Sequence, residues 1–166
     1  MVKTTGNARG RKSGKTAQWL GILLPVLAFL LLAAPVLGAE RDFPALTGRV
    51  VDRADLFTQE EEDELTRVLA DLEAATTHQF VVATIQSVGD DEIKMYAAEL
   101  GHYWRLGQKG KDNGALLLVA IRDRQVAIQV GYGLEPVLTD GQSGEIIQEQ
   151  ILPFFRRGDY FGGVKA

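Results

Sequence analysis

Two glycine-rich stretches, residues 104–114 and 131–140, contain side chains that could bind a hard metal ion. The candidate ligands are three carboxylates and one amide: Asp112, Asn113, Glu135 and Asp140. Carboxylate and carbonyl oxygens suit Ca²⁺ or Mg²⁺ and do not suit soft metals. The glycines permit tight turns that expose backbone carbonyl oxygens. If the fold brings the two stretches together, they predict a Ca²⁺ or Mg²⁺ site.

Ordinary loop chemistry is the alternative interpretation of the same residues. Asp112-Asn113-Gly114 has the composition of a turn. Asp140 is a good cap for the start of a helix. Spacing alone does not separate these structural roles from metal binding, so both interpretations stay open.

Other catalytic or cofactor-binding patterns are weak. Lys109-Gly110-Lys111 suggests phosphate binding, but the Walker and dinucleotide-binding glycine patterns are absent from the sequence. His78 and His102 fall on different predicted elements and lack the spacing of a zinc hydrolase. The chain has no Cys, which excludes thiol chemistry and cysteine metal sites. No catalytic residue can be assigned from these patterns.

The elements that must position the candidate ligands start with three strands, predicted at about 79–86, 115–121 and 125–131. The tight turn at 122–124 makes the last two an antiparallel hairpin. Stretch 104–114 enters this hairpin and stretch 131–140 leaves it, so both should lie at one end of the sheet. The strand containing Leu117 is apolar on both faces and should be central. Val50-Val51 could add an edge strand.

Helices are expected between and after these strands. Residues 58–61 (Thr-Gln-Glu-Glu) form a capping box before an amphipathic helix. Asp90 or Asp91 should cap a second helix. Thr139-Asp140 should cap a third helix, which Pro153 ends or kinks. A parallel crossover plus a hairpin, with helices on both faces, predicts a three-layer α/β/α sandwich with a small mixed β-sheet.

Residues 1–39 have the pattern of an export segment. Five Lys and Arg residues occur there, no Asp or Glu precedes Glu40, and residues 19–39 are uncharged. A basic flank followed by an apolar stretch predicts a signal peptide, cleaved after Gly38 or Ala39. The stretch is also long enough to span a bilayer as an uncleaved membrane anchor. Either way, we expect the rest of the chain in the periplasm or on the outer face of the cytoplasmic membrane.

The charge of the remaining chain limits its partners. The whole sequence has 18 basic and 22 acidic residues, and the five basic residues before Glu40 leave 13 against 22, a net charge of −9. Such a domain repels nucleic acid and anionic head groups and suits cations or basic partners. The alternative is that the charge serves solubility alone.

Four ordered motifs resemble those of the TPM domain family, over about residues 43–166. They are Thr47-Gly-Arg-Val-Val-Asp52, Lys109-Gly-Lys-Asp-Asn-Gly114, Val130-Gly-Tyr-Gly-Leu-Glu135 with Leu138-Thr-Asp140, and Ile151-Leu-Pro-Phe154 with Gly158-Asp-Tyr160. The resemblance implies an α/β/α sandwich, export or membrane anchoring, and the divalent-metal binding of some family members. It adds Asp52 to the candidate ligands. It also implies a domain truncated at its C-terminal end. Residues 40–57 are expected to form an extended lead-in, because Pro44 and Gly48 disfavour helix.

Two functions remain as hypotheses. One is a non-catalytic adaptor in the cell envelope, which binds a divalent cation and docks on a membrane protein complex. The other, implied by the resemblance, is a metal-assisted phosphatase in which a divalent ion, held by Asp112 and Asp140, polarises a phosphate ester. The sequence shows no nucleophile–base pair for the second hypothesis, so the adaptor is favoured.

Overall fold

The structure is a computed structural model that describes Met1 and residues 41–166. Residues 42–166 form one compact unit that contains both hydrophobic clusters and all the helices and strands described here. The predicted export segment at 1–39 lies outside the described residues apart from Met1, so it stays a prediction. Within 41–166, no helix combines the length and apolar character needed to cross a bilayer.

A four-stranded mixed sheet forms the middle layer. The strands are β1 (Val50–Asp52), β2 (Gln79–Ile85), β3 (Gly114–Ala120) and β4 (Gln125–Val130), and they lie side by side in that order. The pairs β1–β2 and β2–β3 are parallel, whereas β3–β4 is an antiparallel hairpin. The three predicted strands and the short edge strand are therefore confirmed.

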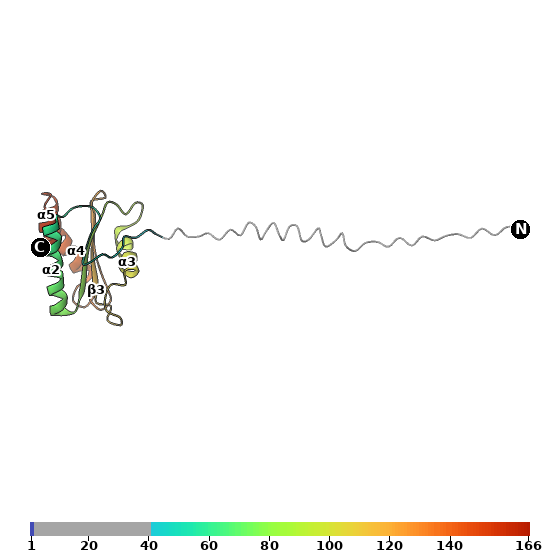
Figure 1. Ribbon diagram of the computed structural model, residues 1–166, viewed down its shortest axis with the longest axis horizontal. Coiled ribbons are helices and arrows are strands. Elements are labelled where there is room, and N and C mark those ends of the chain that lie inside the picture. The colour runs from blue at the N-terminus through green and yellow to red at the C-terminus, as the bar shows by residue number, and fades with distance from the viewer. Residues whose placement is uncertain (2–40) are drawn as a thin grey trace. The chain divides into compact units, whose positions relative to one another are not determined.

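Helices cover both faces of the sheet, which confirms the predicted sandwich (Figure 1). Helix α3 (Ile93–Tyr103) packs on one face. On the other face lie α2 (Gln59–Thr76), α4 (Asp140–Ile146) and α5 (Leu152–Phe155). A short helix, α6 (Tyr160–Lys165), packs beside α5.

The main core lies between the sheet and α3. Leu116 and Leu118 of β3 point into it, and Leu118 is 0 % exposed. Leu117 lies on the opposite face of β3, because neighbouring side chains of a strand alternate, and there it is only half-buried. Strand β3 is thus interior as predicted, but its most deeply buried leucine is Leu118 and not Leu117.

Helix caps follow local sequence in two of three cases. Thr58 and Glu61 form the predicted capping box of α2. Helix α3 is capped by Glu92, whose carboxylate accepts the amide of Met95, and not by Asp90 or Asp91. Helix α4 begins as predicted after Thr139, which forms a capping box with Gln142; Asp140 is its first helical residue.

Pro153 does not end the third helical segment, but the helix departs from regular α geometry directly before it. The five residues before α5, Ile147–Ile151, form a π-helical turn in which the amide of Leu152 donates to the carbonyl of Ile147. The ring of a proline clashes with the carbonyl four residues earlier in an α-helix. The wider turn relieves this clash, so the chain continues helically from α4 through α5.

Candidate functional site

The two glycine-rich loops lie together at one end of the sheet, as the topology predicted. The amide of Gly131 donates to the carbonyl of Gly114 at 2.8 Å, and the amide of Gly133 donates to the carbonyl of Asp112 at 3.0 Å. The loop that enters β3 is therefore hydrogen-bonded through its backbone to the loop that leaves β4. We call this end of the molecule the loop end.

Glycine is required where the two backbones touch. A Cβ atom on Gly133 would lie 1.9 Å from the carbonyl oxygen of Lys111, and one on Gly131 would lie 2.2 Å from that of Asp112. No carbon atom fits at such distances. Asp112 itself has a φ of 47°, a left-handed conformation that Asp tolerates better than most residues. Its side chain is exposed at the tip of the contact.

Asn113 has a structural role within the same loop. It is 4 % exposed. Its side-chain oxygen accepts the amide of Gln108 at 2.8 Å, and its side-chain nitrogen donates to the carbonyl of Thr77 at 2.7 Å. Because its side-chain oxygen already accepts a hydrogen bond inside the protein, Asn113 serves as a clamp between the loop and the end of α2.

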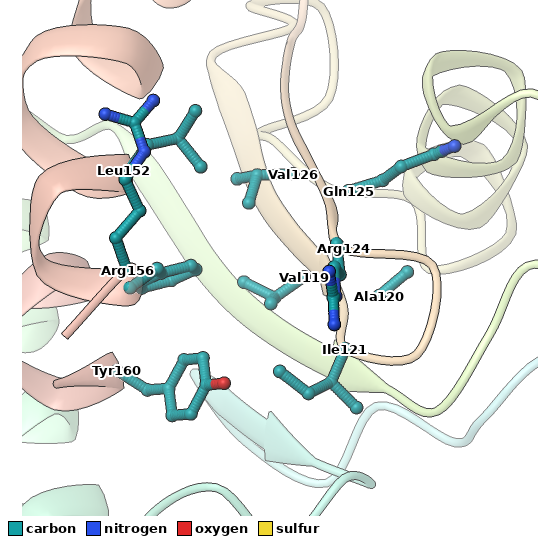
Figure 2. Close-up of a pocket in the computed structure, with 10 residues that line it drawn as sticks. Val119, Ala120, Ile121, Arg124, Gln125, Val126, Leu152, Arg156 and Tyr160 are labelled. Carbon is teal, nitrogen blue, oxygen red and sulfur yellow. The ribbon is translucent and has the colours of Figure 1, made fainter. Parts of the chain in front are cut away.

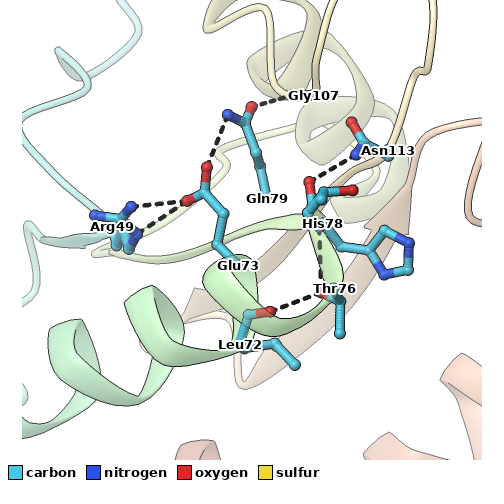
Figure 3. A network of polar contacts seen from close by, with 9 residues as sticks. Arg49, Leu72, Glu73, Thr76, His78, Gln79, Gly107 and Asn113 are labelled. Atoms are coloured by element: carbon cyan, nitrogen blue, oxygen red, sulfur yellow. Dashed lines mark hydrogen bonds and ion pairs between the residues drawn. The ribbon is translucent and has the colours of Figure 1, made fainter.

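A polar network beneath the loop end was not foreseen from the sequence (Figure 3). Arg49 donates two hydrogen bonds to the carboxylate of Glu73, and Gln79 donates to its other oxygen at 3.1 Å. The side-chain oxygen of Gln79 accepts the amide of Gly107 at 3.0 Å. The hydrogen bonds from Arg49, and next from Gln79, lower the pKa of Glu73. This network ties the entrance of β1, α2 and β2 to the loop before β3.

The three carboxylates of the loop end are exposed: Asp112, Glu135 and Asp140. Within the described part of the chain, no three His, Asp or Glu side chains are gathered closely enough to hold a metal ion. A small cleft of about 110 Å³ opens beside Asp112, and its polar lining includes His102, Gln129 and Tyr132. The loops are thus brought together, but their carboxylates do not form a preassembled metal centre.

Asp52 lies at the opposite end of the sheet from Asp112. It is the last residue of β1, whereas Asp112 precedes β3, and β1, β2 and β3 run parallel. Its carboxylate accepts hydrogen bonds from the Thr84 hydroxyl and from the amides of Ala54 and Phe57. Asp52 therefore shapes the turn after β1 and does not join the other candidate ligands.

Three large side chains with apolar surface are exposed on the loop after β4 and at the end of α3, and one of them, Tyr132, lines the small cleft. Tyr132 is 79 % exposed and Val137 is 63 % exposed, both on the loop that follows β4. Tyr103, at the end of α3, is also exposed, and its ring packs against Phe43 with a centroid distance of 5.4 Å. A contiguous group of such side chains is typical of surfaces that bind another molecule, whereas single ones are common on any protein.

Comparison with known proteins places this geometry in a family. The TPM domain model matches residues 50–166. No curated protein matches the chain significantly. Among solved structures, the N-terminal domain of a protein from P. gingivalis has 32 % sequence identity and a TM-score of 0.66, over 71 % of this chain and 75 % of that one.

Two further solution structures share the fold at lower identity. The N-terminal domain of a Corynebacterium glutamicum protein is 16 % identical, with a TM-score of 0.57 over 78 % of this chain and 80 % of that one. A protein from the psychrophilic bacterium Bizionia argentinensis is 22 % identical, with a TM-score of 0.58 over 67 % and 75 %. The family match over most of the chain, together with the 32 % identity to the first structure, establishes that this chain belongs to the TPM domain family.

Proposed function

We propose that this TPM domain is a non-catalytic interaction module of the cell envelope that binds a partner at its loop end, assisted by a divalent cation. The observation that carries the proposal is the backbone contact between the two loops, in which Gly131 and Gly133 meet Asp112. This contact fixes the position of an exposed carboxylate beside an exposed aromatic side chain, Tyr132.

The cation would be held weakly. Asp112, Glu135 and Asp140 project from the two loops, while Asn113 and Asp52 already make hydrogen bonds within the protein. A hard ion such as Ca²⁺ accepts carboxylates, carbonyls and water as ligands, and open sites with few charges bind it at about 10⁻⁴–10⁻³ M. Such an ion would draw the two loops together and reduce the repulsion between their carboxylates.

The adaptor role is supported by the surface of the loop end. Tyr132 and Val137 offer apolar contact area, and Tyr is enriched where proteins bind each other. The net charge of −9 over residues 40–166 favours a basic partner, and a membrane protein complex is the partner that we propose. Export to the envelope is part of the same proposal and depends on residues 1–39.

The test is a Ca²⁺ titration of residues 42–166 followed by amide NMR. We expect amides near Asp112 and Asp140 to shift together and the melting temperature to rise, because a ligand of the native state stabilises it. Asp112→Asn should weaken Ca²⁺ binding about tenfold, which corresponds to about 1.4 kcal/mol. Asp90→Asn, which removes the same charge from an exposed turn at the other end of the sheet, should not.

Two outcomes would contradict the proposal. If millimolar Ca²⁺ shifts neither loop, the cation does not belong to the function. If the Ca²⁺-loaded domain hydrolyses a generic phosphate ester, and Asp112→Asn abolishes that turnover, the domain is a metal-assisted phosphatase and not an adaptor.

A further inference from the structure

A second cleft opens at the end of the sheet opposite the loop end. It has a volume of about 700 Å³ and lies between the β3–β4 hairpin and helices α5 and α6. Figure 2 shows Val119, Ile121 and Val126 on the strand side, with Leu152, Arg156 and Tyr160 facing them from the helices. The volume lies within the range of small-molecule sites. We call it the hairpin cleft.

The lining of the hairpin cleft is apolar in its interior and basic at its edges. Apolar side chains come from both walls, with Val119 and Val126 opposite Leu152 and Phe155. Two exposed arginines, Arg124 and Arg156, also line the cleft. A cleft of this kind offers one surface to hydrocarbon and another to an anion.

The two guanidinium groups are available for a ligand. Among the described residues, neither Arg124 nor Arg156 makes an ion pair or a side-chain hydrogen bond. Nearby Arg157, by contrast, stacks over the ring of Phe154 at 4.6 Å. The hydroxyl of Tyr160 extends towards the strand wall, and its ring is held by an edge contact with Phe155 at 5.1 Å. Guanidinium groups bind carboxylate and phosphate through paired hydrogen bonds.

Both walls are held in place by other contacts. On the strand side, Asp123 in the hairpin turn accepts hydrogen bonds from the Ser87 hydroxyl at 2.8 Å and from the Val88 amide at 2.7 Å. On the helix side, Asp159 caps α6, and Gly163 packs so closely on Phe155 that a Cβ atom there would lie 2.7 Å from the ring. Ligand binding therefore does not require the walls to be ordered first.

We propose that the hairpin cleft binds a single-chain anionic amphiphile, an alkyl chain that carries a carboxylate or phosphate head group. The net charge of −9 over residues 40–166 repels a bare anion at long range. The local attraction of Arg124 and Arg156 must therefore be supplemented by apolar contact, which the alkyl chain makes with Val119, Val126 and Leu152. This site uses different residues from the loop end, so it does not depend on the function proposed above.

The test measures binding of dodecanoate and dodecyl phosphate to residues 42–166, below the concentrations at which these probes form micelles. Calorimetry gives the affinity, and amide NMR locates the site. We expect shifts at Val119, Val126 and Tyr160, and tighter binding of one probe would identify the head group. Inorganic phosphate should bind much more weakly because it has no alkyl chain. Dodecyltrimethylammonium should also bind much more weakly, because its head group is positively charged.

Paired arginine variants separate the cleft from overall charge. Arg156→Gln and Arg124→Gln should each weaken binding about tenfold, since each removes a charge-assisted hydrogen bond. Arg157→Gln and Arg122→Gln remove the same charge from neighbouring positions that do not line the cleft, and they should change the affinity less than about twofold.

The proposal is overturned if dodecanoate and dodecyl phosphate leave the cleft amides unshifted. It is also overturned if the control variants weaken binding as much as the cleft variants, or if the cationic amphiphile binds equally well. All four arginines have largely exposed side chains, so melting curves without ligand should show that the variants remain folded.

Discussion

Replacing Gly133 by Ala tests the contact that builds the loop end. The added methyl carbon would lie 1.9 Å from the carbonyl oxygen of Lys111. Carbon atoms are best separated from their neighbours by about 3.5–4.0 Å, so the two loops would have to move apart by about 1.5 Å or more. The hydrogen bond from the Gly133 amide to the Asp112 carbonyl, now 3.0 Å, would be lost or severely lengthened.

The loss of stability in Gly133→Ala follows from the steric clash and the lost hydrogen bond. Overpacking costs about 1–3 kcal/mol, and the hydrogen bond contributes about 0.5–1.5 kcal/mol net. Gly133→Ala should therefore lower the free energy of unfolding by about 2–4 kcal/mol. For a domain of this size, that corresponds to a drop in melting temperature of about 8–16 °C.

Gly144→Ala is the matched control. Gly144 lies in α4, and a Cβ atom there would have no neighbour within 4 Å. Its substitution should raise stability by about 0.5–1 kcal/mol, because Ala favours the helix over Gly. Urea unfolding of residues 42–166 measures both variants. Equal stability of Gly133→Ala and the wild type would refute the close contact between the loops.

Three further predictions follow from other parts of the molecule. Leu118→Ala should lower the free energy of unfolding by about 2–5 kcal/mol, and Leu117→Ala should lower it less because Leu117 is only half-buried. If denaturant unfolding showed the larger loss for Leu117→Ala, the assignment of the two faces of β3 would be wrong. Glu73→Gln should destabilise the domain at pH 7, and the difference from the wild type should begin to shrink near the ordinary pKa of 4.5 and vanish once the pH falls below the lowered pKa of the folded state. A carboxyl group with a lowered pKa stabilises the folded state only while the group is ionised, so the stabilisation is lost in acid. A difference in melting temperature between variant and wild type that stays constant from pH 7 to pH 3 would contradict this prediction. The exported protein should lack the residues before about Glu40, and an intact mass that retains Met1 would instead indicate a membrane anchor.

Local patterns predicted most of the fold. The capping box at Thr58 depends on residues within one helical turn, and the hairpin depends on a short turn between two apolar runs, so the sequence alone contains the necessary information. The predicted cap of α3 was wrong because each of three consecutive acidic residues, Asp90 to Glu92, has a carboxylate that could accept a backbone amide at the start of a helix. Burial of Ile93 against the sheet decides that Glu92 is the cap, and this is a tertiary effect.

The loop end was predicted only in outline. Antiparallel pairing was enough to bring the two loops to one end of the sheet. The hydrogen bonds of Asn113 and the network from Arg49 to Gln79 join residues far apart in sequence, and no local pattern reveals such contacts. The placement of Asp52 could have been foreseen. A residue at the end of one parallel strand and a residue just before another parallel strand lie at opposite ends of the sheet.

The π-helical turn before Pro153 sets the rotational phase of everything after it. Each residue of an α-helix turns the chain by about 100°, so a π turn amounts to one residue inserted into an otherwise continuous helix. If the same residues formed a regular α-helix instead, α5 would be rotated by about 100°, and Leu152 and Arg156 would leave the hairpin cleft. The wider turn absorbs this rotation together with the clash at Pro153. A homologue with one residue fewer in this turn and no proline after it should therefore continue as regular α-helix and keep α5, and with it the hairpin cleft, in the same orientation.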